Sequence, residues 1–567
     1  MIVGIDLGTT NSLIAAFGKD KPVLIQNAVG DFLTPSAVHN NRKNGILVGQ
    51  AALDLLTTEP QNTAARFKRR MGTNGVLQIG RDQFLPEELS AFVLKSLKAD
   101  AEKELGETIE DAVISVPAYF NDIQRKATIA AAQIAGFNVR RLINEPTAAA
   151  LAYGLHAKEN ESTFLVVDLG GGTFDVTILE MFSGVMEVRA SAGDAFLGGE
   201  DFTDCICSYF LKSLGYEEDG LPNADHARLR ALAEKIKQQL SSSPTANGVF
   251  VREGTEYPLT ISRTLFEELT EKLTRRIRLP IQRAISDAQL TPAQIDRIIL
   301  VGGATRMPVI SNLMTKLFKR FPEFDLNPDH VVALGAAVQA GLLERHKALE
   351  EMVMTDVCPF TLGHDISRIL SGPNDLETGI FAPLIERNTT VPVSRSHIIT
   401  PLRPGGRHLA IDIYQGEAPY VKDNIKIGSY NVPIPYNPKE CENVDIRFTY
   451  DTSGVLEVLG TVVSTGVVSK LIIERTPGQM SPQEIKQRFT ALERIKIHPR
   501  DEIKNAALIA RLNAEYENTL GQQRQSISDW LVTFEIALKT HDKREIEAAR
   551  KAVEEHLQFL SGSNAFE

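Results

Sequence analysis

The sequence predicts a multidomain protein with an α/β domain first, an antiparallel β-sandwich second and a helical segment last. Three observations predict this order. Residues 1–345 alternate β-branched apolar runs with helical patterns, residues 357–475 have a period of two, and residues 476–567 return to a helical period. Residues 346–356 lie between the first two patterns and are interpreted as an interdomain linker. The 567 residues are enough for two to four domains with complete hydrophobic cores.

Three apolar runs of the first domain each end in a glycine-rich turn, at residues 2–10, 164–173 and 298–306. Such runs are typical of buried strands, and glycine lets backbone N–H groups approach an anion closely. The first two turns also carry Asp6 and Asp168 at the strand ends. Since a carboxylate repels a phosphate unless a cation lies between them, this pattern predicts a hydrated Mg²⁺. The turns together predict that the chain binds and hydrolyses ATP between two lobes.

These turns match neither of two common nucleotide motifs. The chain has no G-x-x-x-x-G-K-[ST] sequence, and no G-x-G-x-x-G follows a predicted strand. Residues 12–17 form another predicted strand, so the first turn is expected to join a β-hairpin rather than to begin a helix. One such turn alone would be an ordinary loop, since Gly and Asp are common in loops. A second turn behind a matching strand favours a phosphate site.

Composition and charge exclude several classes of protein. A net charge of −11 argues against a nucleic-acid partner, which would favour a basic surface. No apolar stretch of 18 residues occurs, and the first residues lack the basic and apolar regions of an export signal. We therefore expect a cytoplasmic protein with no membrane partner. Four cysteines without zinc-binding spacing are expected to be free thiols: Cys205, Cys207, Cys358 and Cys441.

The second domain is predicted from strict alternation. Leu409, Ile411 and Ile413 share one face of a strand, and residues 444–450 repeat the pattern before a turn at residues 451–454. Short alternating strands separated by turns are typical of an antiparallel β-sandwich.

The last segment is predicted to be an amphipathic helical bundle. Residues 481–484 form a capping box with proline at the first helical position, which satisfies N–H groups that the first turn leaves without partners. Leu508, Leu512 and Tyr516 follow at four-residue steps on one stripe.

Further motifs carry a resemblance to a known family. The motifs are VPAYFND at 116–122, NEPTAAA at 144–150, LGGEDF at 197–202 and RNTTVP at 387–392. Together with the three turns, they make the chain from residue 2 to about residue 475 closely resemble the Hsp70 chaperone family, and its shorter length and altered linker are similar to a specialised bacterial branch of it.

The resemblance implies a fold and an activity. It implies an actin-like (ribonuclease H-like) two-lobed ATPase domain, a peptide-binding antiparallel β-sandwich and an α-helical lid. The implied function is that of a molecular chaperone, which binds unfolded or extended apolar peptide segments and releases them under control of ATP binding and hydrolysis.

The resemblance also implies a catalytic set. From the residues alone, Lys68 in the basic run 66–70 would be a solvated side chain, but it matches the family's catalytic lysine. A cation there would offset charge on the γ-phosphoryl oxygens during in-line attack by water. The implied catalytic residues are Lys68, Glu145, Asp168 and Thr173, of which Glu145 and Thr173 flank the water.

The implied cofactors are ATP or ADP and Mg²⁺, with K⁺ as a further candidate. Asp6 and Asp168 hold the magnesium ion through water, whereas Thr9 and Thr10 contact phosphate. Glu234, Lys237 and Ser241 lie at i, i+3 and i+7 on one predicted helix face, where they could hold an adenosine. The full predicted set is Asp6, Gly8, Thr9, Thr10, Gly170, Gly171, Gly172, Gly198, Gly199, Glu234, Lys237, Ser241, Gly302, Gly303 and Arg306.

Other residues are implied in coupling and in partner binding. Pro117 and Arg125 match a switch that reports the nucleotide state to the linker, and Arg141 and Asn144 match positions that contact J-domain co-chaperones. The implied peptide-binding residues are Ile399, Leu402, Leu409 and Ile411. Periodicity alone fits sandwich core equally well for those four.

Three segments depart from the family pattern. The linker at residues 351–355 contains methionine where the family has a leucine-rich run, which predicts altered coupling between domains. Residues 371–375 interrupt the region expected to arch over bound peptide, which leaves peptide specificity open. The segment 246–259 is shorter than the family's exchange-factor region, so dependence on a nucleotide exchange factor stays open.

Three alternatives remain open from the residues alone. An actin-superfamily small-molecule kinase would share the two-lobed ATP site but would leave residues 356–567 without a role. An actin-like filament protein would polymerise with ATP. A peptide-binding module with a regulatory nucleotide would not need Lys68 for turnover.

Overall fold

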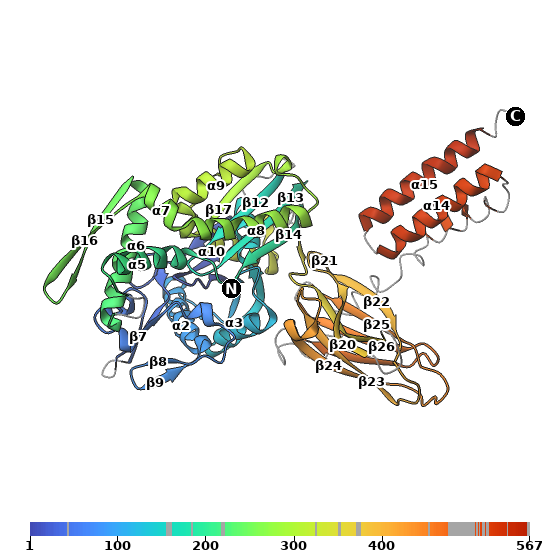
Figure 1. Ribbon diagram of the computed structural model, residues 1–567, viewed down its shortest axis with the longest axis horizontal. Coiled ribbons are helices and arrows are strands. Elements are labelled where there is room, and N and C mark those ends of the chain that lie inside the picture. Colours follow the sequence, from blue (N-terminus) through green and yellow to red (C-terminus); the bar gives the residue numbers. More distant parts are fainter. Residues whose placement is uncertain are drawn as a thin grey trace. The chain divides into compact units, whose positions relative to one another are not determined.

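The computed structural model describes two compact units (Figure 1). One comprises Met1–Thr361 with Glu386–Val391, and the other comprises Leu362–Ile385 with Pro392–Glu567. The described residues are 1–41, 45–154, 162–182, 185–216, 221–323, 326–349, 353–369, 376–451, 454–473, 505, 508–509, 511–512, 516, 521–540 and 543–563.

The first unit has two lobes, each built on a six-stranded mixed sheet. The first sheet has the order β11-β10-β1-β2-β3, with β4 paired to β2, and the second has the order β17-β12-β13-β14-β18-β21. The strands of the first sheet are β1 (Ile2–Asp6), β2 (Asn11–Phe17), β3 (Pro22–Leu24), β4 (Thr34–Pro35), β10 (Asp111–Val116) and β11 (Asn138–Asn144). Those of the second are β12 (Ser162–Leu169), β13 (Phe174–Phe182), β14 (Val185–Asp194), β17 (Arg297–Val301), β18 (Val353–Val357) and β21 (Thr390–Val391).

The two sheets share one pairing pattern around their aspartate-bearing strands. Strand β1 pairs antiparallel with β2 and parallel with β10, and strand β12 pairs antiparallel with β13 and parallel with β17. The hairpin predicted for the first turn is therefore confirmed. Because β12 and β17 are parallel neighbours, the turns that follow them lie at the same edge of the second sheet. The turn after β1 lies at the edge of the first sheet where β1 and its parallel neighbour β10 end.

Each lobe has its own core and its own covering elements. Phe67, Leu94 and Ile114 belong to the core of the first lobe, whereas Phe202 and Ile298 belong to that of the second. The first lobe further contains β5 (Ala37–Asn41), β6 (Gly45–Val48), α1 (Gln50–Leu55), η1 (Pro60–Asn62), β7 (Thr63–Ala65), η2 (Phe67–Arg70), β8 (Leu77–Ile79), β9 (Asp82–Phe84), α2 (Pro86–Leu105) and α3 (Asp122–Ile134). The second further contains α5 (Gly199–Ser213), α6 (Asn223–Ser242), β15 (Thr245–Arg252), β16 (Thr255–Ser262), α7 (Arg263–Leu269), α8 (Glu271–Asp287), η3 (Pro292–Gln294), η4 (Gly303–Arg306) and α9 (Pro308–Phe318).

Two helices, α4 (Glu145–Gly154) and α10 (Val331–Leu343), join the lobes through a third core. That core combines Val113 of the first sheet with Val166 of the second. The approach is close, since a Cβ on Gly335 of α10 would lie 1.7 Å from the carbonyl oxygen of Ala148 in α4. Alanine and glycine along these helices therefore set the separation of the two sheets. The short helix η5 (Lys347–Leu349) follows α10.

The boundary of the first unit differs from the sequence expectation. Residues 353–357, expected at the junction of linker and sandwich, form β18, which pairs parallel with β14 and antiparallel with β21. An unpaired edge of β14 offers N–H and C=O groups that a further strand can satisfy. Alternation in sequence shows that a segment is extended, but it does not identify the partner strand. Residues 350–352 lie outside the described residues.

The second unit contains two four-stranded antiparallel sheets, in the orders β20-β19-β23-β24 and β22-β25-β26-β27. They stack face to face, since the hydroxyl of Tyr430 on one sheet donates to Ser469 Oγ on the other at 2.8 Å. The period-two prediction is confirmed, because residues 409–413 and 444–450 both lie in strands. The elements are β19 (Leu362–Ile369), β20 (Leu376–Ile385), β22 (Val393–Ile399), β23 (His408–Gln415), η6 (Val421–Asp423), β24 (Ile425–Pro433), β25 (Val444–Tyr450), β26 (Leu456–Val462) and β27 (Val468–Ile473).

Two long helices complete the described chain, α14 (Gly521–Thr540) and α15 (Lys543–Ser563). Phe534 and Val553 pack between them with Leu508 and Leu512, which confirms the buried stripe at those two positions. Tyr516 is 37% exposed, and the guanidinium of Arg524 lies over its ring. The capping box predicted at residues 481–484 and the interrupting segment 371–375 lie outside the described residues.

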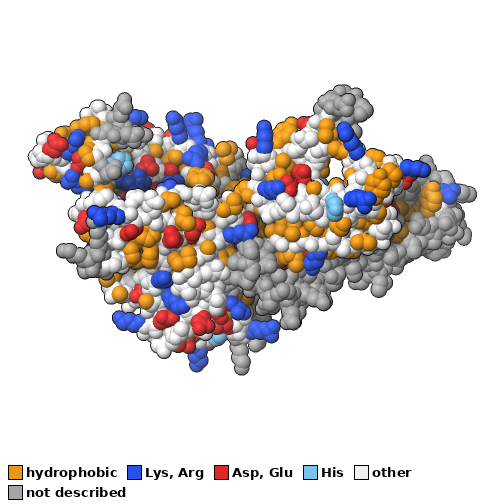
Figure 2. All heavy atoms as spheres, turned by 90° about the horizontal axis from the view of Figure 1, so that it is seen from below, with side chains coloured by type: hydrophobic (Ala, Val, Ile, Leu, Met, Phe, Trp, Pro, Cys, Tyr) orange, Lys and Arg blue, Asp and Glu red, His pale blue; other side chains and the backbone are white. Residues whose placement is uncertain are grey.

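Surface charge and cysteine chemistry fit the composition. Figure 2 shows positive and negative side chains mixed over the face that it presents. The four cysteines are free thiols, as expected. Among the described residues, we find no helix that combines the length and the apolarity needed to cross a membrane.

A histidine pair bridges the two sheets of the second unit. His364 Nε2 on β19 lies 2.9 Å from His397 Nε2 on β22, and His364 Nδ1 lies 2.9 Å from the carbonyl oxygen of Asp365. A carbonyl only accepts, so Nδ1 of His364 carries the proton and its Nε2 accepts from His397. His364 must be neutral to accept this hydrogen bond, because a doubly protonated ring has no acceptor nitrogen.

We expect the second unit to lose stability as the pH falls from 7.5 to 5.5. Burial lowers the pKa of His364 and of His397, so below the usual histidine pKa the unfolded chain takes up protons that the folded chain does not. The stabilisation is therefore present above that pKa and is lost as the pH falls through it. Hydrogen-exchange protection of β19 and β22, measured at both pH values, checks this. An equal pH response in His364→Gln would contradict it.

Candidate functional site

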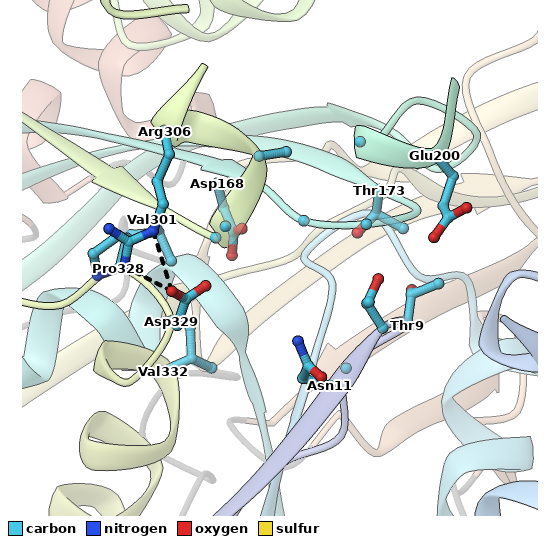
Figure 3. Close-up of a pocket in the computed structure, with 18 of the residues that line it drawn as sticks. Thr9, Asn11, Asp168, Thr173, Glu200, Val301, Arg306, Pro328, Asp329 and Val332 are labelled. Atoms are coloured by element: carbon cyan, nitrogen blue, oxygen red, sulfur yellow. Dashed lines mark hydrogen bonds and ion pairs between the residues drawn. The ribbon is translucent and has the colours of Figure 1, made fainter. Parts of the chain in front are cut away.

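A cavity of about 470 Å³ lies in the first unit at the carboxyl ends of β1, β12 and β17, and the glycine-rich turns after these strands line it (Figure 3). The sequence analysis predicted most of this lining. The predicted residues that line it are Asp6, Gly8, Thr9, Thr10, Lys68, Glu145, Asp168, Gly170, Gly171, Thr173, Gly199, Glu234, Lys237, Ser241, Gly302, Gly303 and Arg306. Gly172 and Gly198, also predicted, are not part of the lining.

The first two turns approach each other so closely that only glycine fits. A Cβ on Gly171 would lie 2.0 Å from Thr10 Oγ1, and a Cβ on Gly172 would lie 2.9 Å from Thr9 Oγ1. A Cβ on Gly8 would lie 1.9 Å from the carbonyl oxygen of Asn11. The two turns therefore form one continuous backbone cradle, the kind of surface that binds phosphate through N–H groups.

Gly198 supports this cradle from behind. The N–H groups of Gly199 and Glu200 donate to the carbonyl oxygens of Gly170 and Gly171, each at 2.9 Å. A Cβ on Gly198 would lie 2.4 Å from the carbonyl oxygen of Gly171. Gly198 thus helps to fix the position of the second turn against the start of α5.

Asp6, Asp168 and Glu145 place three carboxylates on the cavity. Burial, reinforced by the negative charge of Glu145, raises the pKa of Asp6 to about 7, although a hydrogen bond from Ser115 at 2.8 Å opposes the shift. Burial likewise raises the pKa of Asp168 well above its ordinary value. Three carboxyl groups thus share the cavity with one lysine.

Lys68 provides the positive charge at the centre of the site. Its Nζ donates to Glu145 Oε1 at 2.7 Å, and the side chain is 4% exposed. The neighbouring basic residues do not share this burial, so the run at 66–70 is not a uniformly solvated face. Lys68 is thus a buried, paired cation on the cavity, and its catalytic role stays a prediction.

Asp6, Asp168 and the nearby threonines fit a magnesium ion. They offer oxygen ligands only, which is the donor type that Mg²⁺ prefers. Because Ser115 occupies one oxygen of Asp6, binding through water molecules suits the remaining lone pairs.

The other end of the cavity carries Glu234, Lys237 and Ser241 of α6 and Arg306 of η4. Burial alone would raise the pKa of Glu234, but Lys237 at 2.7 Å and a hydrogen bond from Thr203 lower it. Across the cavity, Arg306 donates to Asp329 Oδ2 at 2.7 Å, the pair joined by dashed lines in Figure 3. These ends supply polar groups and a planar cation, which suit a sugar and a base.

The two switch residues predicted from the resemblance lie together. Arg125 is 3% exposed, and its guanidinium donates to the carbonyl oxygens of Pro117, Ala118 and Phe120. It also donates to Asn144 Oδ1 at 2.8 Å. Asn144 is 8% exposed, which differs from the expectation of a surface contact for a J-domain protein. Arg141, half-buried on β11, is more accessible than Asn144.

The predicted peptide-binding residues differ in accessibility. Ile411 is 2% exposed and belongs to the sandwich interior, contrary to the expectation of a peptide contact. Leu402 is 44% exposed, and Ile399 and Leu409 are half-buried. Alternation could not separate these cases, because a residue that faces inward on a strand is either core or pocket depending on what covers it.

Several residues on or beside the cavity were not predicted. Asp175 is 1% exposed, burial raises its pKa to about 7, and it accepts a hydrogen bond from the Tyr119 N–H at 3.1 Å. A charged residue inside the apolar strand that follows the second turn was the available signal for Asp175. Asn11, Glu200, Gln238 and Asp329 line the cavity and have no comparable signal in the sequence.

This geometry is that of a two-lobed protein with a carboxylate-flanked lysine beside two glycine-rich turns, an arrangement suited to phosphate binding. The family described as "Hsp70 protein" matches residues 2–76 and 75–565. The chaperone protein DnaK of Thermosipho melanesiensis is 42% identical over 486 residues, which are 83% of this chain and 80% of that protein. DnaK of Thermotoga neapolitana is 41% identical over 509 residues, 86% of this chain and 82% of that protein.

The chain belongs to the Hsp70 family. It is an Hsp70-type molecular chaperone that binds exposed apolar peptide segments and releases them under control of ATP binding and hydrolysis, and it is therefore an ATP hydrolase. Membership implies that the nucleotide is ATP or ADP bound with Mg²⁺. The kinase alternative is not favoured.

We expect Gly198→Ala to weaken nucleotide binding, although Gly198 does not line the cavity. The added methyl would meet backbone atoms at 2.4–2.5 Å, which cannot rotate away, so the second turn must shift. Overpacking of this kind costs about 1–3 kcal/mol, which corresponds to a loss of roughly 5–150-fold in affinity. Calorimetric titration with Mg·ADP measures the change. Unchanged affinity would mean that the turn does not depend on this contact.

Proposed function

We propose that the cavity binds Mg·ATP with its triphosphate on the two glycine-rich turns and its adenosine between α6 and η4. The observation that carries this proposal is the buried Lys68–Glu145 pair beside Asp6 and Asp168, at the point where the turns meet. Bound magnesium would neutralise phosphate charge. The N–H groups of the turns would orient the γ-phosphoryl group.

Lys68 supplies the charge stabilisation of hydrolysis in this proposal. Its ammonium group lies in a buried, water-poor site, where a charge interaction is stronger than in solvent. Glu145 holds the ammonium group in place and, with Thr173, orients the attacking water.

The proposal extends to the layout of the chain. The first unit would be the actin-like ATPase, residues 357–475 the peptide-binding sandwich and residues 476–567 the helical lid, with a linker before the sandwich. J-domain co-chaperones are the proposed partners, with Arg141 as the more accessible of the two predicted contacts, and the cytoplasm is the proposed location. Membership of the specialised bacterial branch known as HscC, a role for K⁺ and dependence on an exchange factor stay predictions.

We expect Lys68→Ala to lower the single-turnover rate of ATP hydrolysis by about 10²–10³-fold, because one preorganised charge at the reacting group is lost. Arg70→Ala is the matched control, since Arg70 lies in the same basic run but is exposed. Its rate should equal that of the wild type. Equal rates for Lys68→Ala and the wild type would instead favour a regulatory nucleotide.

Peptide release tests the coupling. ATP should accelerate dissociation of a fluorescent apolar peptide from the wild type by about 5–150-fold, the range that a coupling free energy of 1–3 kcal/mol gives. Thr173→Ala should release the peptide on ATP addition but should recover high affinity slowly, because its hydrolysis step is impaired. Release that ignores saturating ATP in the wild type would overturn the proposal.

A further inference from the structure

The catalytic lysine is flanked by two arginines that reach consecutive acidic residues. Arg66 Nη1 lies 3.1 Å from Glu200 Oε2, and Arg69 Nη2 lies 2.7 Å from Asp201 Oδ2. Lys68 lies between these arginines on the single turn η2. The turn that carries Lys68 is thus held on both sides by ion pairs with the first residues of α5.

These ion pairs connect the two lobes of the first unit. Phe67 of η2 belongs to the core of the first lobe, whereas Phe202 of α5 belongs to that of the second. The start of α5 is itself bonded to the second phosphate turn through the N–H groups of Gly199 and Glu200. A separation of the lobes would therefore break both ion pairs at once and would leave η2 attached to the first lobe alone.

The two carboxylates are fixed on the second lobe. Glu200 Oε2 also lies 2.5 Å from Arg230 Nη2 of α6, and Asp201 Oδ2 accepts from the N–H of Gly198 at 2.7 Å. Glu200 in addition lines the nucleotide cavity (Figure 3). Glu200 and Asp201 are therefore held in place on the second lobe, and Arg66 and Arg69 of the first lobe form ion pairs with them.

The backbone at Arg66, the residue before η2, is in an unfavourable conformation that the ion pairs can stabilise. Arg66 has a φ of 63° in the left-handed region, which is unfavourable for a residue with a side chain. Such conformations persist where the surrounding structure over-determines them, and they cluster at functional sites. The side-chain exposures of the four paired residues, 33% and 12% for Arg66 and Glu200 and 21% and 22% for Arg69 and Asp201, place the pairs below the exposed surface.

We propose that Arg66 and Arg69 are positioning residues for hydrolysis, which hold Lys68 at its reacting position only while the two lobes are closed. The inference rests on the proposed role of Lys68. It goes further by making lobe closure itself the step that assembles the catalytic charge. ATP binding would need only the cradle, whereas hydrolysis would need the cradle and the two cross-lobe ion pairs.

The test separates binding from turnover. In the full chain, Arg66→Ala should lower the single-turnover rate at saturating Mg·ATP by about tenfold, since small misplacement of a catalytic group costs up to 10²-fold. The dissociation constant for Mg·ATP should change less than twofold. Arg66→Lys should restore most of the rate. The wild-type rate should also fall between 50 mM and 500 mM NaCl, and that of the double variant Arg66→Ala/Arg69→Ala should be insensitive to salt.

Two further variants control for the backbone conformation of Arg66 and for the loss of an ion pair in general. Arg66→Gly removes the charge but suits a left-handed backbone, so it should also be slow even if Arg66→Ala folds poorly. Arg297→Ala is the matched control, because Arg297 and Glu323 form an ion pair of similar exposure, 27% and 28%, within one lobe. Its rate should be that of the wild type.

The outcomes distinguish two failures. If Lys68→Ala slows hydrolysis but Arg66→Ala, Arg66→Gly and the double variant do not, the positioning role is overturned and the nucleotide site stands. A rate in Arg66→Lys as low as in Arg66→Gly would overturn it as well, because charge would not then be what matters. If Lys68→Ala hydrolyses ATP at the wild-type rate, the proposed catalytic role of Lys68 is overturned, and the positioning role of the two arginines is overturned with it.

Discussion

The close backbone contact between α4 and α10 is the constraint on which the rest of the first unit depends. Gly335 meets Ala148 with no room for a side chain, and Gly4 of β1 likewise meets the backbone of α10, where a Cβ would lie 2.1 Å from the N atom of Ala337. Only small residues allow this approach. It brings the ends of β1 and β12 to one cavity, so that two turns far apart in sequence become one phosphate cradle.

That proximity brings three carboxyl groups and one lysine together on a buried cavity. Asp6, Asp168 and Glu145 share a buried site with one lysine, and burial raises the pKa of both aspartates. Buried carboxylates without enough positive charge favour a cation. A nucleotide bound there with its metal, as proposed, would supply positive charge beside these carboxylates.

The chain leaves the first unit and returns to it, because β18 and β21 both belong to that unit. Residues 386–391 pack on the first unit, where Arg387 donates to both oxygens of Asp287 at 2.9 Å and Asn388 accepts from the Ser191 N–H at 3.0 Å. The chain on either side of them belongs to the sandwich. These contacts lie within the first unit and fix residues 386–391 against α8 and β14.

The sequence by itself predicted the three glycine-rich turns, the strands that precede them and the alternating strands at residues 409–413 and 444–450, because backbone sterics and alternation act locally. It also placed Lys68, although only through the family resemblance, since a lysine in a basic run is by itself a surface residue. The tertiary structure alone decided that Ile411 is core, that Asn144 is buried against Arg125 and that Gly198 supports the cradle from behind. It alone also placed Arg66 and Arg69 opposite Glu200 and Asp201, because contacts between lobes depend on how distant segments pack and leave no periodic signal in the chain.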